Sequence, residues 1–203
     1  MKQIDFDHGT VTGNILGVAL PMLVAQILSL LYNIVDRIYI ARIPSVGTTA
    51  LGAVGLCFPI IVIITAFSNL FGSGGAPLFS INRGKGNIKK AEAIMNTSFS
   101  MLCICGVTLM VIGMLFASPI LVLFGESEEG LSYAYPYMMI YLIGTVPSMI
   151  ATGMNPFINA QGYATSGMLS VTIGAVANLI LDPLFIFGLN LGIKGAAIAT
   201  IIS

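Results

Sequence analysis

The first residue that could do chemistry is Asp182, a carboxylate inside the apolar stretch NLILDPLFIFG at positions 178–188. A charged side chain at the centre of a bilayer costs about 2.5 to 3.5 kcal/mol on insertion scales, so an acid in such a stretch indicates function. Asn178 lies one helical turn earlier, which directs an amide and a carboxylate to the same helix face. The spacing therefore predicts a polar site inside the membrane.

Asp36 is a second acid in an apolar region, with Asn33 about one turn before it. The residues alone leave two interpretations open. Asp36 could lie at the same depth as Asp182, or the segment DRIYIAR at positions 36–42 could be interfacial, where a helix leaves the membrane. Two carboxylates, an amide and a hydroxyl at one depth would suit a hard cation such as sodium, or a proton shared between the acids. No cofactor other than such an ion is expected.

Prolines and further oxygen-bearing side chains lie near these acids. Pro21 and Pro183 each remove a backbone hydrogen bond, which kinks a helix and frees carbonyls, and both a structural and a functional role are open for them. Tyr137 and Thr200 lie near span ends. Taken alone, they are typical of an aromatic anchor at the interface and of a hydroxyl in helix packing.

The composition indicates what kind of protein positions these groups. Of 203 residues, 57% are hydrophobic and only 8% are charged, against about 25% charged residues in soluble domains. The chain is therefore expected to be an integral membrane protein in contact with lipid. Eight basic and eight acidic residues cancel, and no long basic stripe occurs, so a nucleic-acid partner is not expected.

Long uncharged intervals predict an all-α fold of transmembrane helices, because a helix needs roughly 20 apolar residues to cross the hydrocarbon. The polar segment NAQGYATSG at 159–167 divides the longest interval. The expected helices lie near 14–40, 48–76, 93–117, 133–157 and 164–188, with a sixth that begins near 195 and is cut off at Ser203. We therefore expect residues 1–203 to be a fragment of a longer membrane protein.

Loop charges predict the orientation. The segment NRGKGNIKK at 82–90 carries four cations, whereas GESEEG at 125–130 carries only carboxylates. The positive-inside rule places the basic loop and the N-terminus in the cytoplasm, as expected for a multi-pass protein of the inner (plasma) membrane. Topology signals are the plainer interpretation of these cations, and a ligand site the less favoured one.

Three segments closely resemble the multidrug and toxic compound extrusion (MATE) transporters: NLILDPLFIFGLNLGIKGAAIATIIS (178–203), ALPMLVAQILSLLYNIVDRIYIARI (19–43) and AYPYMMIYLIGTVPSMIATGMNPFINAQG (134–162). The resemblance implies twelve helices in two pseudo-two-fold lobes. This chain would be the N-terminal six-helix lobe, with its sixth helix truncated and the C-terminal lobe of the same chain missing.

The resemblance also implies roles for individual residues. A Na+ or H+ coupling site would be formed by Asp36, Asn178, Asp182 and Thr200. Tyr137 and Asn33 are expected to belong to a substrate or proton network, and Pro21 to a helix bend. Arg37 departs from the pattern, since a neutral residue is more usual after the first aspartate.

The function implied by this resemblance is secondary active efflux. A small organic substrate, cationic or amphipathic, would leave the cell in exchange for Na+ or H+ by alternating access. A lipid-linked oligosaccharide flippase is the neighbouring alternative, but the spans offer carboxylates where flippases usually need cations, Arg37 excepted. An intramembrane aspartyl protease is disfavoured because Val35-Asp36 and Leu181-Asp182 lack the Tyr-Asp and Gly-x-Gly-Asp pairs of those enzymes. The chain is therefore not expected to be an enzyme.

Overall fold

The computed structural model describes residues 10–44 and 46–203, and within these ranges the chain is helical and contains no strand. Four elements are long and apolar enough to cross a membrane: α1 (Val11–Ala41), α2 (Gly47–Gly84), α3 (Ile88–Leu123) and α6 (Ala164–Pro183) with the π-helical turn Leu184–Gly188. The bent pair α4 (Glu128–Ile143) and α5 (Thr145–Ala160) makes a fifth span when counted together, and α7 (Ile193–Ile202) is shorter. The expected all-α membrane fold is confirmed.

The single helix expected over 133–157 is instead broken into α4 and α5, which meet at an angle of 56°. At the break, the N–H of Gly144 donates to the carbonyl of Tyr141, three residues earlier, at 3.0 Å. Pro147 has no N–H to offer the carbonyl four residues before it. Gly144 also packs against the side chain of Ile201 in α7. Hydropathy continues across the break, so apolar length alone could not reveal it.

Other helix bounds also differ from the expected ones. α2 has 38 residues and α3 has 36, because both helices continue past their apolar segments to the turn at which Asn87 caps α3. The span expected over 164–188 is α-helical only to Pro183. It then widens into a π-helical turn, in which the N–H of Leu189 donates to the carbonyl of Leu184 at 2.8 Å.

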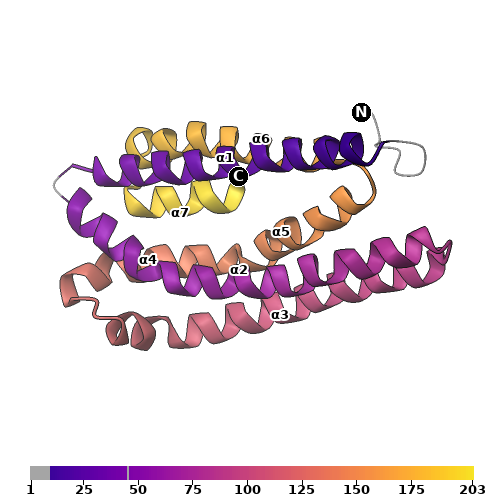
Figure 1. Ribbon diagram of the computed structural model, residues 1–203. Helices are drawn as coiled ribbons and strands as arrows, with labels where there is room; N and C mark the ends of the chain where they lie inside the picture. The colour runs from indigo at the N-terminus through magenta and orange to yellow at the C-terminus, as the bar shows by residue number, and fades with distance from the viewer. Residues whose placement is uncertain (1–9, 45) are drawn as a thin grey trace.

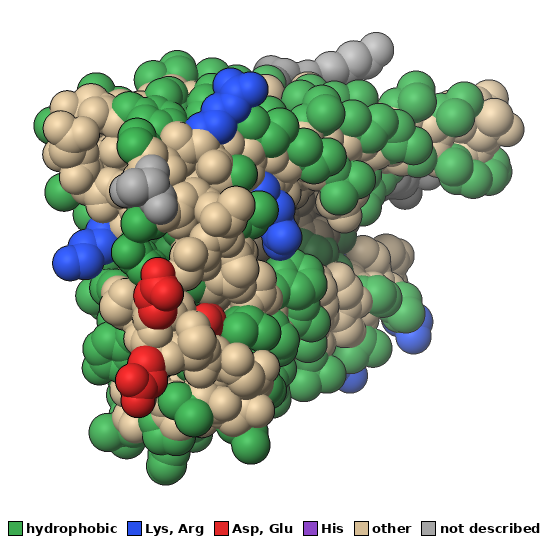
Figure 2. Space-filling model, turned by 90° about the vertical axis from the view of Figure 1, so that its left-hand side faces the viewer, with side chains coloured by type: hydrophobic (Ala, Val, Ile, Leu, Met, Phe, Trp, Pro, Cys, Tyr) green, Lys and Arg blue, Asp and Glu red, His purple; other side chains and the backbone are tan. Residues whose placement is uncertain are grey.

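The helices form two groups that lie side by side (Figure 1). In one group α1 packs mainly on α6, with α7 alongside; in the other, α2 packs mainly on α3 and α5. Contacts of α4 with α7 and of α5 with α6 join the groups. Seen from the end that carries the α3–α4 connection, the surface is hollowed between the two groups (Figure 2).

The two ends of the bundle differ. The start of α1 and the α2–α3 turn lie at one end, and the α3–α4 connection lies at the other (Figure 1). Most large side chains of α1 are exposed apolar ones, and Ile40 is its one buried residue among those described. α1 therefore packs closely on α6, while a long apolar surface of the same helix is exposed and is not covered by other described residues.

Candidate functional site

The packing of α1 on α6 brings Asp36 and Asp182 together. Their carboxyl groups lie within hydrogen-bonding reach of each other. Asp182 is fully buried and Asp36 partly so. Because two ionised carboxylates are both acceptors, a hydrogen bond between them requires one proton on the pair. The arrangement is therefore suited to hold either a proton or a cation between the two acids.

Asn178 completes the polar cluster from the α6 side. Its Nδ2 donates to Asp182 Oδ1 at 3.3 Å, one helical turn away, and the residue is 1% exposed. This contact confirms that the two side chains share a helix face. Three buried oxygens of this cluster have no hydrogen-bond partner in the described chain, namely Asp36 Oδ1, Asp182 Oδ2 and Asn178 Oδ1.

These three oxygens can be tested against the chemistry of a bound ion. Buried polar atoms without partners are costly, and a cation or a proton supplies what such acceptors lack. Hard cations prefer oxygen donors of this kind. In residues 10–44 and 46–203, no three His, Cys, Asp or Glu side chains are grouped as a metal site. The oxygen donors of this cluster are two carboxylates and a neutral amide, which suit a hard cation or a shared proton.

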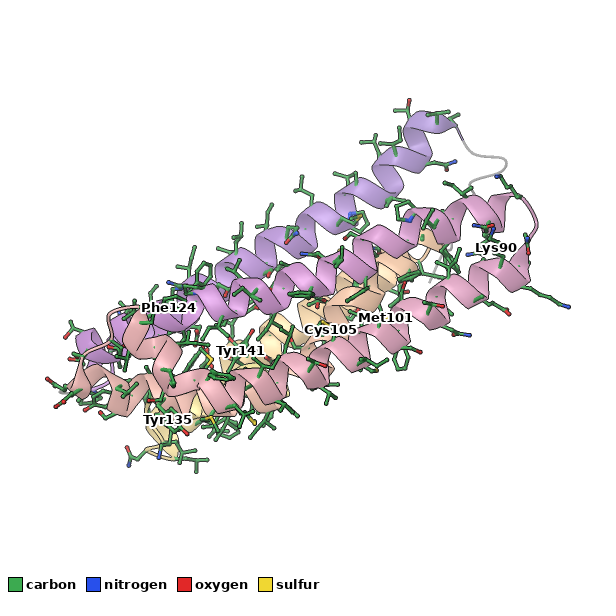
Figure 3. The ribbon with its side chains drawn as sticks, turned by 90° about the horizontal axis from the view of Figure 1, so that it is seen from below. Lys90, Met101, Cys105, Phe124, Tyr135 and Tyr141 are labelled. Carbon is green, nitrogen blue, oxygen red and sulfur yellow. The ribbon has the colours of Figure 1, made fainter. Side chains whose placement is uncertain are left out.

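Tyr137 approaches this cluster from α4. Its side chain is 3% exposed and lies close enough to Asp36 to interact with its charge. The ring stacks on that of Tyr141, with centroids 6.4 Å apart and planes inclined by 18°. Tyr141 was not singled out from the sequence, although its spacing of four residues from Tyr137 was the available signal. Figure 3 marks its place within the bundle.

Thr200 and Asn33, expected in the ion site and the substrate network, have other partners, and Pro21, expected at a helix bend, lies farther along α1. The Thr200 hydroxyl donates to the carbonyl of Ala196 at 2.9 Å, within its own helix. Asn33 is exposed, and its Nδ2 donates to the carbonyl of Ser29 at 2.7 Å. Pro21 lies inside α1, about 22 Å along the axis from Asp36 at 1.5 Å per residue. The hydrogen bonds of Thr200 and Asn33 stay within their own helices.

Arg37 follows Asp36 but points elsewhere. Its guanidinium carbon lies 5.5 Å from the centroid of the Phe58 ring in α2, a cation–π contact. The side chain is exposed, yet its charge is close enough to act on Asp36. α1 therefore presents a carboxylate to α6 and a cation to α2 from adjacent positions.

Comparison with known proteins decides the family. The family model described as MatE matches residues 21–184, most of the chain. The chain belongs to the MatE family. It is similar to a protein of Shewanella oneidensis named FAD transporter, with 30% identity over 97% of this chain and 44% of the relative. It is also similar to the multidrug export protein MepA of Staphylococcus haemolyticus, with 29% identity over 98% of this chain and 43% of the relative.

Solved structures give the same assignment. A structure described as the outward-facing conformation of a multidrug resistance MATE family transporter superimposes with a TM-score of 0.88 and 27% identity. That match covers 96% of this chain and 42% of the solved one. A second, described as MATE in complex with MaD5, superimposes with a TM-score of 0.91 and 26% identity, covering 100% of this chain and 45% of that one.

The comparisons also show how much of the relatives this chain represents. The chain spans less than half the length of the curated relatives it matches. The half-length match agrees with the expected six-helix lobe of the MATE fold. The first of these solved structures is described as a MATE family transporter, which agrees with the expectation that the chain is not an enzyme.

Proposed function

We propose that the chain forms the N-terminal lobe of an antiporter that exports organic compounds in exchange for Na+ or H+. The observation that supports it most is the Asp36–Asp182 pair, whose carboxyl groups meet between α1 and α6 while each keeps a buried oxygen without a partner in the described chain. An ion bound between two helices favours the arrangement in which both carboxylates reach it. Loading and release of that ion would then shift α1 relative to α6.

Each residue has a proposed role in this cycle. Asp36 and Asp182 hold the coupling ion, and the Asn178 amide orients Asp182 through its hydrogen bond. Tyr137 contributes a buried hydroxyl that is near enough to Asp36 for its charge to act on it. Thr200 stays a proposed ligand in a conformation where its hydroxyl leaves the Ala196 carbonyl, and Asn33 a proposed member of the substrate network. Pro21 is the proposed bend in α1.

The exchange requires a second lobe, because alternating access moves one lobe against another. We propose that a C-terminal lobe covers part of the apolar surface of α1 and that the cavity between the lobes takes the substrate. We place the protein in the inner (plasma) membrane with its N-terminus and the α2–α3 turn in the cytoplasm, as the basic segment 82–90 indicates.

We propose cationic or amphipathic organic compounds as substrates. Several relatives at 25% to 29% identity are named multidrug export proteins, and the Asp36–Asp182 site is acidic. A second candidate is an anionic flavin nucleotide. It is supported by the 30% identity to a protein named FAD transporter and by the exposed Arg37.

Efflux measurements under sodium and proton gradients that are imposed separately test the coupling. The full-length protein is reconstituted in liposomes, and export of a fluorescent cation and of FAD is followed under a sodium gradient and, separately, a proton gradient. Asp36→Asn and Asp182→Asn should each abolish gradient-driven export while leaving insertion and thermal stability intact. Wild-type export by both variants would remove the proposal, and export of FAD alone would select the second candidate.

A further inference from the structure

The ends of α2 and α3 that flank the α2–α3 turn pack against α5. Phe79 of α2 packs edge-to-face on Phe157 of α5, with ring centroids 5.6 Å apart and planes inclined by 79°. Ala91 of α3 joins the same buried cluster, in which each of the three side chains is at most 5% exposed. The helices on either side of the turn are thus held against α5.

The turn itself is closed by its own backbone. Gly86 has φ +74, a conformation that glycine adopts without strain. The N–H of Asn87 donates to the carbonyl of Asn82 at 2.9 Å, and the Asn87 side chain caps α3 by accepting from the N–H of Lys90 at 3.2 Å. The cations that flank this turn therefore have fixed backbone positions.

Exposed side chains on this turn change from apolar to cationic along one stripe. Leu78, Ile81 and Lys85 are spaced by three and four residues, so they follow one face of α2. Leu78 and Ile81 are 55% and 52% exposed, and Lys85 is exposed beyond them. Lysine at the end of such a stripe extends its charge to the headgroup level while its stem stays on apolar surface.

Charge accumulates at this end of the bundle. Arg83, Lys85, Lys89 and Lys90 stand against one acid, Glu92, which leaves a net charge of +3 over residues 81–92. Lys90 marks this end in Figure 3, far from Phe124 and Tyr135. The opposite end carries acidic and basic side chains together (Figure 2). At about 1.5 Å per residue, α2 spans about 57 Å, more than the hydrocarbon of about 30 Å, so its end can reach the headgroups.

We propose that the α2–α3 turn is a contact surface for anionic phospholipids. Leu78 and Ile81 lie against acyl chains, and Lys85, Lys89 and Lys90 bind the headgroup phosphates. The inference concerns attachment to the membrane surface and does not depend on the transported substrate or the coupling ion.

Residues 1–203 contain no tryptophan, so a local test is possible in full-length protein in which any tryptophan of the proposed C-terminal lobe is replaced by phenylalanine. Ile81→Trp supplies a single reporter beside the turn, and Leu123→Trp supplies a matched reporter at the opposite end, where Leu123 is 81% exposed. The protein is reconstituted in mixtures of phosphatidylcholine and phosphatidylglycerol, one of the two brominated. Quenching by each brominated lipid then gives, at each reporter, the association constant of phosphatidylglycerol relative to that of phosphatidylcholine.

At Ile81→Trp we expect phosphatidylglycerol to be favoured by at least about fivefold, the factor that a single one of the three lysines would supply near an anionic surface. Adding Lys85→Gln, Lys89→Gln and Lys90→Gln should bring the ratio to about one, the value expected at Leu123→Trp. Equal ratios at both reporters, or an unchanged ratio in the glutamine variant, would overturn the proposal. Inorganic phosphate is added as a competitor, with sodium chloride at the same ionic strength as its control. If phosphate displaces brominated phosphatidylglycerol more than sodium chloride does, the turn binds free phosphate and the proposal is overturned.

Discussion

Gly72 of α2 and Gly153 of α5 meet backbone to backbone, and a Cβ on Gly72 would collide with the Gly153 carbonyl. One turn away, the hydroxyls of Ser68 and Thr152 share a hydrogen bond of 2.6 Å across the same two helices. Small residues and polar hydrogen bonds are the usual means of close helix association in membranes, where lipid removes the hydrophobic driving force. The glycine contact and the hydrogen bond together hold α2 against α5.

Gly72→Ala should therefore destabilise the lobe, because the neighbouring atom is backbone and cannot move aside. We expect a cost of about 1 to 3 kcal/mol, the range for overpacking, seen as a lower apparent Tm in detergent. Gly74→Ala is the matched control, since nothing lies within 4 Å of its Cβ position. It should leave Tm unchanged or raise it. Equal Tm values for the two variants would contradict the close approach.

Asn178→Ala should weaken ion coupling because it removes the hydrogen bond to Asp182 in a buried site. A hydrogen bond to a charged group contributes about 1.5 to 3 kcal/mol, which corresponds to roughly 10-fold to 100-fold in apparent ion affinity. The measurement is the ion concentration that gives half-maximal efflux. Asn82→Ala serves as the control, since the Asn82 Nδ2 donates within its own helix, to the carbonyl of Leu78 at 2.8 Å, and lies near the end of α2 away from the acids. Similar losses in both variants would contradict a specific role for the Asn178 amide.

Tyr137→Phe should retain the stack on Tyr141 and remove only the hydroxyl beside Asp36. We propose that this hydroxyl donates to Asp36 or to its ion during transport. Its removal should then lower the rate of gradient-driven efflux on the order of tenfold, the effect of one hydrogen bond to a charged group, with Tm unchanged. The comparison is Tyr135→Phe, because Tyr135 is 40% exposed on the same helix. A Tyr137→Phe variant with the wild-type rate would remove this hydroxyl from the proposed mechanism.

Gly144→Ala should disturb the contact between the α4–α5 break and α7, because its Cβ position is already filled by Ile201. Overpacking at one site costs about 1 to 3 kcal/mol. Ile201→Ala opens space at the same place, so the double variant should recover part of the lost Tm. A double-mutant cycle measures this coupling, and strictly additive effects would indicate that the two residues do not meet.

The sequence by itself determined the local features of this protein. Apolar length and charge spacing are enough to predict a helical membrane lobe, since a chain without backbone partners in lipid must form helices. The pairing of Asn178 with Asp182 also follows from sequence, because residues four apart on a helix share a face wherever the helix lies. The resemblance to the MATE family could also be recognised from the amino-acid sequence alone.

Tertiary structure alone decided the rest. Asp36 could have been interfacial or buried, and only the packing of α1 on α6 brought its carboxyl group to Asp182. The same packing left Asn33, on the same helix, exposed and bonded to its own backbone. The bend at Gly144 lies where Ile201 of α7 packs against the glycine, while hydropathy runs unbroken through it. Spacing along a helix fixes which side chains share a face, but the neighbour that a face meets depends on contacts between segments far apart in the chain.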